Sequence, residues 1–143
     1  MLAHPITKPM HSLVSAAIVL TLVGLCIPPL AFAGVILNTI DQVAIVTDTG
    51  RHLIVTGPFE CTAGERSHIG LTVTQRSTGA VAEGRTIDTC TGGAQQWEVD
   101  ASTRGAETFE EGPATAVAVG RTTDRGETTD AHQWLVEITL VGE

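Results

Sequence analysis

The feature that most restricts the fold of this chain is the alternation of apolar and polar residues in short runs. The run over residues 52–61 places every second residue on one face, namely Leu53, Val55, Gly57, Phe59 and Cys61. A period of two is that of a β-strand with one buried face, whereas an amphipathic helix needs a period near 3.6. Pro58 lacks a backbone N–H, so it predicts a bulge or an edge position in this strand.

About seven such runs follow one another, separated by turn signals such as Asp48-Thr49-Gly50 and Ser77-Thr78-Gly79. We predict strands over residues 42–47, 52–61, 68–75, 80–90, 95–101, 114–120 and 132–141. The residues expected to face the core in the later runs are Ile69, Leu71, Val73, Trp97, Val99, Val117, Val119, Trp134, Val136, Ile138 and Leu140. Strands at spacings of about 8–12 residues predict an all-β fold, specifically an antiparallel sandwich.

Residues 1–33 have the order of a secretory signal peptide. A short segment with Lys8 and no acid precedes an apolar run over residues 13–25, and Ala31-Phe32-Ala33 fits a cleavage site before Gly34. We therefore expect a signal peptide and a secreted or extracellular domain of residues 34–143.

Two alternatives remain open for this segment. An uncleaved N-terminal anchor, with the domain facing outside, would need about 20 apolar residues, and the proline pair near residue 28 interrupts the run. A lipid on Cys26 would need a small residue before the cysteine, where the chain has Leu25.

The charge excludes several classes of function. The chain has 8 Lys+Arg against 16 Asp+Glu, a formal net charge of −8, and cleavage would remove its single lysine, Lys8. Nucleic-acid binding by phosphate neutralisation and stable docking on anionic lipid after cleavage are therefore not expected. The remaining chain has no lysine and no tyrosine, which excludes Schiff-base chemistry and tyrosine acids.

Cys61 and Cys90 are the two cysteines of the expected mature domain. In an exported chain such a pair predicts a disulfide, and a loop of about 30 residues gives it about 3–4 kcal/mol on the chain-entropy model. A reactive thiol or a metal ligand is the alternative, but no electropositive setting is indicated.

Trp97 and Trp134 allow two interpretations. Either ring could be a stacking platform that faces a flat ligand. Packing inside the fold, against the disulfide and between sheets, is the other interpretation and the one favoured for a sandwich.

The sequence predicts no catalytic residue, no metal site and no cofactor, so the chain is not expected to be an enzyme. His52, His68 and His132 lie on separate strands without metal-ligand spacing. Ser67 and His68 are neighbours on a strand and therefore point to opposite faces. The acids Glu107, Glu110, Glu111, Asp124, Glu127 and Asp130 lack the calcium-loop pattern and are expected to form a solvated rim.

Several segments together resemble a known group of proteins: residues 57–61, 69–75, 90–92, 96–99 and 109–116, followed by an apolar last strand. The chain resembles uncharacterised secreted proteins of actinobacteria and similar bacteria over residues 43–141. The resemblance implies an immunoglobulin-like β-sandwich with one disulfide and export, and implies no activity. Unlike antibody domains, the chain has no tyrosine for a tyrosine corner.

Two functions therefore remain from the sequence. The first is an exported, non-enzymatic domain that binds an extracellular partner or acts in adhesion. The second is a small-ligand carrier resembling the neocarzinostatin-like apoproteins. A proteinase inhibitor is less favoured, because no disulfide braces the exposed segment at residues 121–130.

Overall fold

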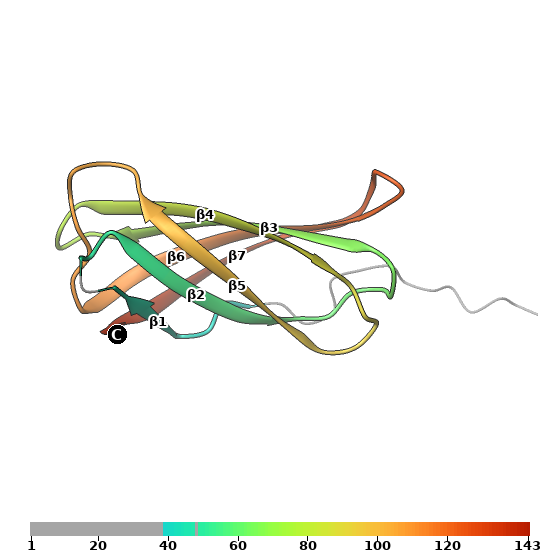
Figure 1. Cartoon of the computed structure of the whole chain (residues 1–143), viewed down its shortest axis with the longest axis horizontal. Coiled ribbons are helices and arrows are strands. Elements are labelled where there is room, and N and C mark those ends of the chain that lie inside the picture. Colours follow the sequence, from blue (N-terminus) through green and yellow to red (C-terminus); the bar gives the residue numbers. More distant parts are fainter. Residues whose placement is uncertain (1–38, 48) are drawn as a thin grey trace, which may run out of the picture. The chain divides into compact units, whose positions relative to one another are not determined.

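The computed structural model describes residues 39–47 and 49–143 (Figure 1). The expected signal peptide, residues 1–33, and its cleavage site between Ala33 and Gly34 lie outside the described residues. Within the described part, no helix has the length and apolar character that crossing a membrane would require.

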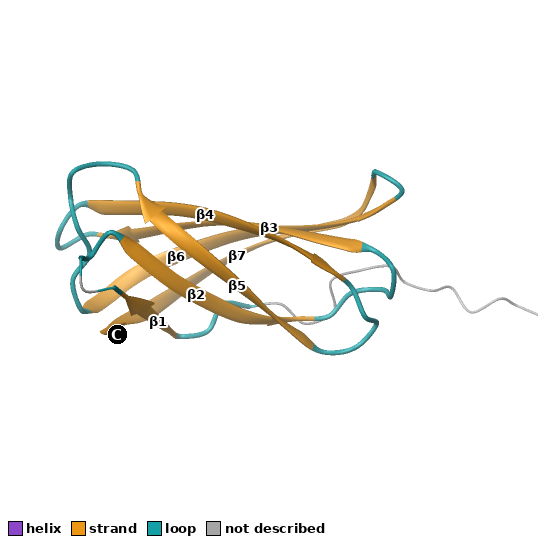
Figure 2. Ribbon diagram, in the orientation of Figure 1, coloured by secondary structure: helices purple, strands orange, loops and turns teal. Residues whose placement is uncertain are grey.

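All regular structure in the described residues is β-strand, as Figure 2 shows, so the all-β prediction is confirmed. The strands are β1 (Val43–Val46), β2 (His52–Phe59), β3 (Arg66–Gln75), β4 (Ala80–Thr89), β5 (Gln95–Thr103), β6 (Gly112–Asp124) and β7 (Glu127–Gly142). In Figure 1, β2 and β5 cross in front of β6 and β7.

The expected immunoglobulin-like sandwich of two open sheets is wrong. The seven strands close into a barrel in the order β1-β2-β5-β4-β3-β6-β7. Neighbouring strands are antiparallel, except that β1 and β7 pair in parallel, with Val43 opposite Thr139. The alternation in the sequence could not separate the two folds, because a sandwich and a small barrel both bury one face of every strand.

The barrel has a short ladder between β4 and β5. Their register contains two Cα pairs, Ala82 with Thr103 and Glu83 with Ser102. At Gly84 the two strands touch so closely that a Cβ would lie 2.5 Å from Val99 Cγ1. Beyond this point β4 continues beside β3 and β5 continues beside β2, so the two strands diverge.

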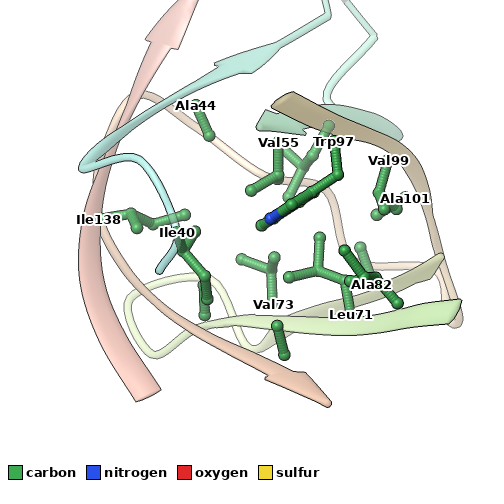
Figure 3. Packing of buried hydrophobic residues seen from close by; sticks show 14 of the residues in the cluster. Ile40, Ala44, Val55, Leu71, Val73, Ala82, Trp97, Val99, Ala101 and Ile138 are labelled. Carbon is green, nitrogen blue, oxygen red and sulfur yellow. The ribbon is translucent and has the colours of Figure 1, made fainter. Parts of the chain in front are cut away.

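The barrel interior holds the core, and most of the predicted inward positions are confirmed (Figure 3). The expected buried residues of β2 and β3 are buried, and Trp134 and Val136 are partly buried and packed against the core. Pro58 lies beyond the short ladder between β1 and β2, at a point where β2 has a strand partner only in β5. This is the edge position predicted for a proline.

The inward face of β6 was wrongly predicted. Val119 is 51% exposed and Val117 is partly buried, while Ala114, Ala116 and Ala118 face the core. Both faces of this alternating alanine–valine run are apolar, so the period does not identify the buried one. Large side chains such as Trp97 and Phe59 occupy the interior, which leaves small residues on the inner side of β6.

Candidate functional site

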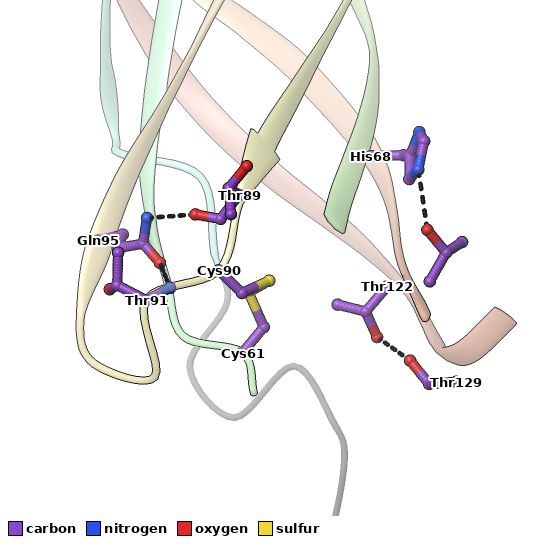
Figure 4. Close-up of a disulfide and its surroundings, with 9 residues drawn as sticks. Cys61, His68, Thr89, Cys90, Thr91, Gln95, Thr122 and Thr129 are labelled. Carbon is purple, nitrogen blue, oxygen red and sulfur yellow. Dashed lines mark hydrogen bonds between the residues drawn. A yellow bond between two sulfur atoms is a disulfide. The ribbon is translucent and has the colours of Figure 1, made fainter. Parts of the chain in front are cut away.

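The disulfide joins Cys61, just after β2, to Cys90, just after β4 (Figure 4). Both residues are buried, and the Cα–Cα distance is 5.4 Å. The backbone N–H of Cys90 donates to the carbonyl of Glu65 at 2.9 Å, and the N–H of Gly64 donates to the carbonyl of Cys90 at 2.9 Å. The disulfide therefore spans β5, which lies between β2 and β4 in the strand order. It lies at the end of the barrel where β4 and β5 do not pair.

The two tryptophans have different surroundings. Trp97 is 1% exposed, and its ring lies over Gly57, where a Cβ would be 2.6 Å from Cζ2. Trp97 therefore has no surface to offer to a ligand. Trp134 is partly buried over Gly120 and stacks on His132 with ring centroids 6.3 Å apart.

The histidines stay on separate strands and each contacts its own neighbours. His52 Nδ1 lies 3.1 Å from Asp100 Oδ1, and His132 Nε2 lies 2.9 Å from Asp130 Oδ2. Ser67 is buried, while His68 points outward and lies 3.2 Å from Thr123 Oγ1. Among the described residues, no three His, Cys, Asp or Glu side chains come together to hold a metal ion.

The outer side of β4, β3 and β6 brings together residues that are distant in the sequence. His68 pairs with Ile87 on β4 and with Arg121 on β6, and Gly70 pairs with Arg85 and Val119 on the same two strands. Paired residues point to the same side of a sheet, so these six form two adjacent rows across three strands. We call this surface, with Arg66 beyond His68 on β3, the arginine face.

The arginine face is hollowed. One depression of about 560 Å³ is lined by the six paired residues together with Ile69 and Thr86. A second, of about 580 Å³, shares Gly70, Arg85 and Val119 with the first and extends to Val117 and Arg104. Both depressions meet at Gly70.

Gly70 differs from the other glycines inside strands. A Cβ at Gly57, Gly84 or Gly120 would collide with neighbouring atoms at 2.2–2.5 Å. A Cβ at Gly70 would meet only the carbonyl oxygen of Val119, at 4.0 Å, so no close contact requires a glycine there. Glycine weakens a strand and often marks a place where a ligand approaches the backbone.

The arginine face carries positive charge on an acidic protein. Arg66, Arg85 and Arg121 form no ion pair with any described residue, whereas Arg104 at the rim pairs with Glu83. Burial lowers the pKa of His68, and the charges of Arg121 and Arg66 lower it further. Ile87 is 49% exposed and Val119 51% exposed, so the same surface offers cations and apolar side chains.

This surface was not predicted from the sequence, because its residues come from three separate runs of the chain. Two signals pointed to it. Gly70 interrupts the run over residues 69–74, which is otherwise apolar or β-branched, and Arg66 and His68 precede it on the same side of the strand at alternate positions.

Comparisons with known proteins do not assign a function. No protein family matches the chain, and no curated protein matches it.

The surroundings of His68 predict a pH dependence of stability. The pKa of His68 is ordinarily 6.5 and is lowered in the folded protein, so the unfolded chain binds more protons below about pH 6.5. Stability should therefore fall as the pH is lowered from 7.5 to 5.5. Urea unfolding of the mature domain at both pH values measures this change. The fall in the free energy of unfolding should be smaller for His68→Gln than for the parent. The other histidines are the same in both proteins, so an unchanged fall in the variant would contradict this assignment.

Proposed function

We propose that this chain is an exported, non-enzymatic binding module that attaches to an extracellular partner through the arginine face. The observation that carries the proposal is the combination of three unpaired arginines, exposed Ile87 and Val119, and the hollow at Gly70. Exposed charges are normally interspersed with opposite ones, and an apolar surface ringed by polar groups is typical of interaction sites. A partner would neutralise the arginines and cover the two aliphatic side chains.

Export is supported by two features of different kinds. Residues 1–33 have the order of a signal peptide, and the disulfide is compatible with an oxidising compartment. Binding without catalysis is supported by the placement of Ser67 and His68 on opposite sides of β3, since a nucleophile and its base must share one site.

Export can be tested on the protein purified from culture medium. Intact-mass spectrometry should give a chain that begins at Gly34 or within a few residues of it, two hydrogens lighter than its reduced form. Full-length protein retained in the membrane would contradict export. A small molecule that co-purifies at one per chain would favour the carrier function instead.

Binding can be tested with the fluorescently labelled mature domain on washed cells of the organism that encodes it. We expect saturable attachment that is lost in an Arg85→Gln/Arg121→Gln variant. An Arg76→Gln/Arg125→Gln variant, with the same change of net charge at exposed positions outside the defined face, serves as the control. Attachment that both variants retain would overturn the assignment of binding to this face.

A further inference from the structure

We propose that the arginine face binds a carboxylate-rich, extended polypeptide segment with an aliphatic side chain between its acids. The inference rests on the proposed binding function and names the ligand of that same site.

The positions of the arginines set the charge of the ligand. Arg85 on β4 and Arg121 on β6 are separated by β3, so their strands lie about 10 Å apart, at the usual strand spacing. Arg66 lies on β3 four residues from Gly70, which is about 13 Å along the strand. An extended segment of about five residues has this length and can place its acids along all three side chains. The guanidinium fork donates two parallel hydrogen bonds to a carboxylate.

The apolar part of the surface favours a polypeptide as the ligand over other polyanions. Ile87 and Val119 lie on opposite sides of β3, next to the hollow that the missing side chain of Gly70 leaves. A sulfated glycan or a polyphosphate would neutralise the arginines but bring no aliphatic group to this hollow. In an extended peptide every second side chain points the same way, so an acid, an aliphatic residue and a second acid can all face the surface.

A symmetric dimer through this face is disfavoured. A twofold contact places the same surface on both subunits, so arginines of one copy would meet arginines of the other. The peptide also has no need to extend the barrel by a strand, because β3 already pairs with β4 and β6 along its length. Recognition is therefore by side chains that lie across the outside of the sheet.

The experiment uses the mature, disulfide-bonded domain and a synthetic peptide, acetyl-Ser-Glu-Ser-Leu-Ser-Glu-Ser-amide, in which both glutamates and the leucine point to one side when extended. Isothermal titration calorimetry at low salt should detect binding. Replacing the glutamates by glutamine should weaken binding at least tenfold, since charge-assisted hydrogen bonds are lost. Replacing the leucine by serine should weaken it severalfold.

Variants of the protein test the site itself. Arg85→Gln/Arg121→Gln should weaken peptide binding at least tenfold, and Arg76→Gln/Arg125→Gln should change it less than twofold. Gly70→Thr should fill the hollow and weaken binding about tenfold, while its thermal unfolding midpoint stays at or above that of the parent. A stable Gly70→Thr domain that binds the peptide as well as the parent does would refute the site.

Two further results separate the ligand from the function. If heparin or vesicles of phosphatidylglycerol bind through Arg85 and Arg121 while the peptide does not, the ligand class is wrong and the binding function stands. If the domain attaches to cells through this face but none of the three probes binds, the peptide proposal is also overturned. If attachment to cells does not depend on the face, the proposed function fails as well.

Discussion

A Cys61→Ala/Cys90→Ala variant should have a free energy of unfolding about 3–4 kcal/mol lower than the parent domain. The crosslink closes a loop with a sequence separation of 29, and the loss of such a constraint increases the entropy of the unfolded chain by this amount. For a domain of this size the unfolding midpoint should fall by roughly 15 °C. Differential scanning calorimetry of the mature domain measures the shift.

The position of the bond adds to this expectation. Cys61 and Cys90 lie where β4 and β5 have diverged, so no strand pairing joins β4 to β5 at that end of the barrel. The parent domain treated with dithiothreitol serves as the control and should melt near the variant. A variant that melts within about 3 °C of the oxidised parent would show that the bond does not stabilise the fold.

Trp97→Ala should lower the free energy of unfolding by about 3–5 kcal/mol. Trp97 is the largest fully buried side chain in the described residues (Figure 3), and its ring lies over Gly57. Truncation removes its burial and leaves a cavity that the strands can close only in part.

Trp134→Ala is the matched control for this prediction. The Trp134 ring is only partly buried, so its loss should cost less than that of Trp97. Urea unfolding of both variants gives the two free energies of unfolding. They can be compared directly when both fall with urea concentration at the same slope. An equal or larger loss for Trp134→Ala would mean that Trp97 is not the centre of the core.

Local strand pattern could be predicted from the sequence, because each buried face repeats every two residues. The run from Leu53 to Cys61 is buried at every alternate position, as expected. The prediction failed in β6, where both sides of the run are apolar and the smaller alanines face the core. A local period carries no information on the volume available across the core.

Barrel closure could not be predicted in the same way. It depends on contacts between ends of the chain, such as Val43 of β1 beside Thr139 of β7. Such a pairing cannot be recognised from the residues of either segment, since both would be apolar strands in a sandwich as well. The arginine face was missed for a related reason, because the register of β3 with β4 and β6 brings its residues together.

The Cys61–Cys90 bond also bears on survival among proteases. The chain between the two cysteines holds the whole β3–β4 hairpin, including Arg66, Gly70 and Arg85. Arg76 is exposed in the turn of this hairpin, and a cut after it would divide the chain in two. The bond would keep both pieces in one molecule, and the ten residue pairs between β3 and β4 would keep them in register. The surface that we propose for binding would thus survive a nick that a chain without the crosslink would not.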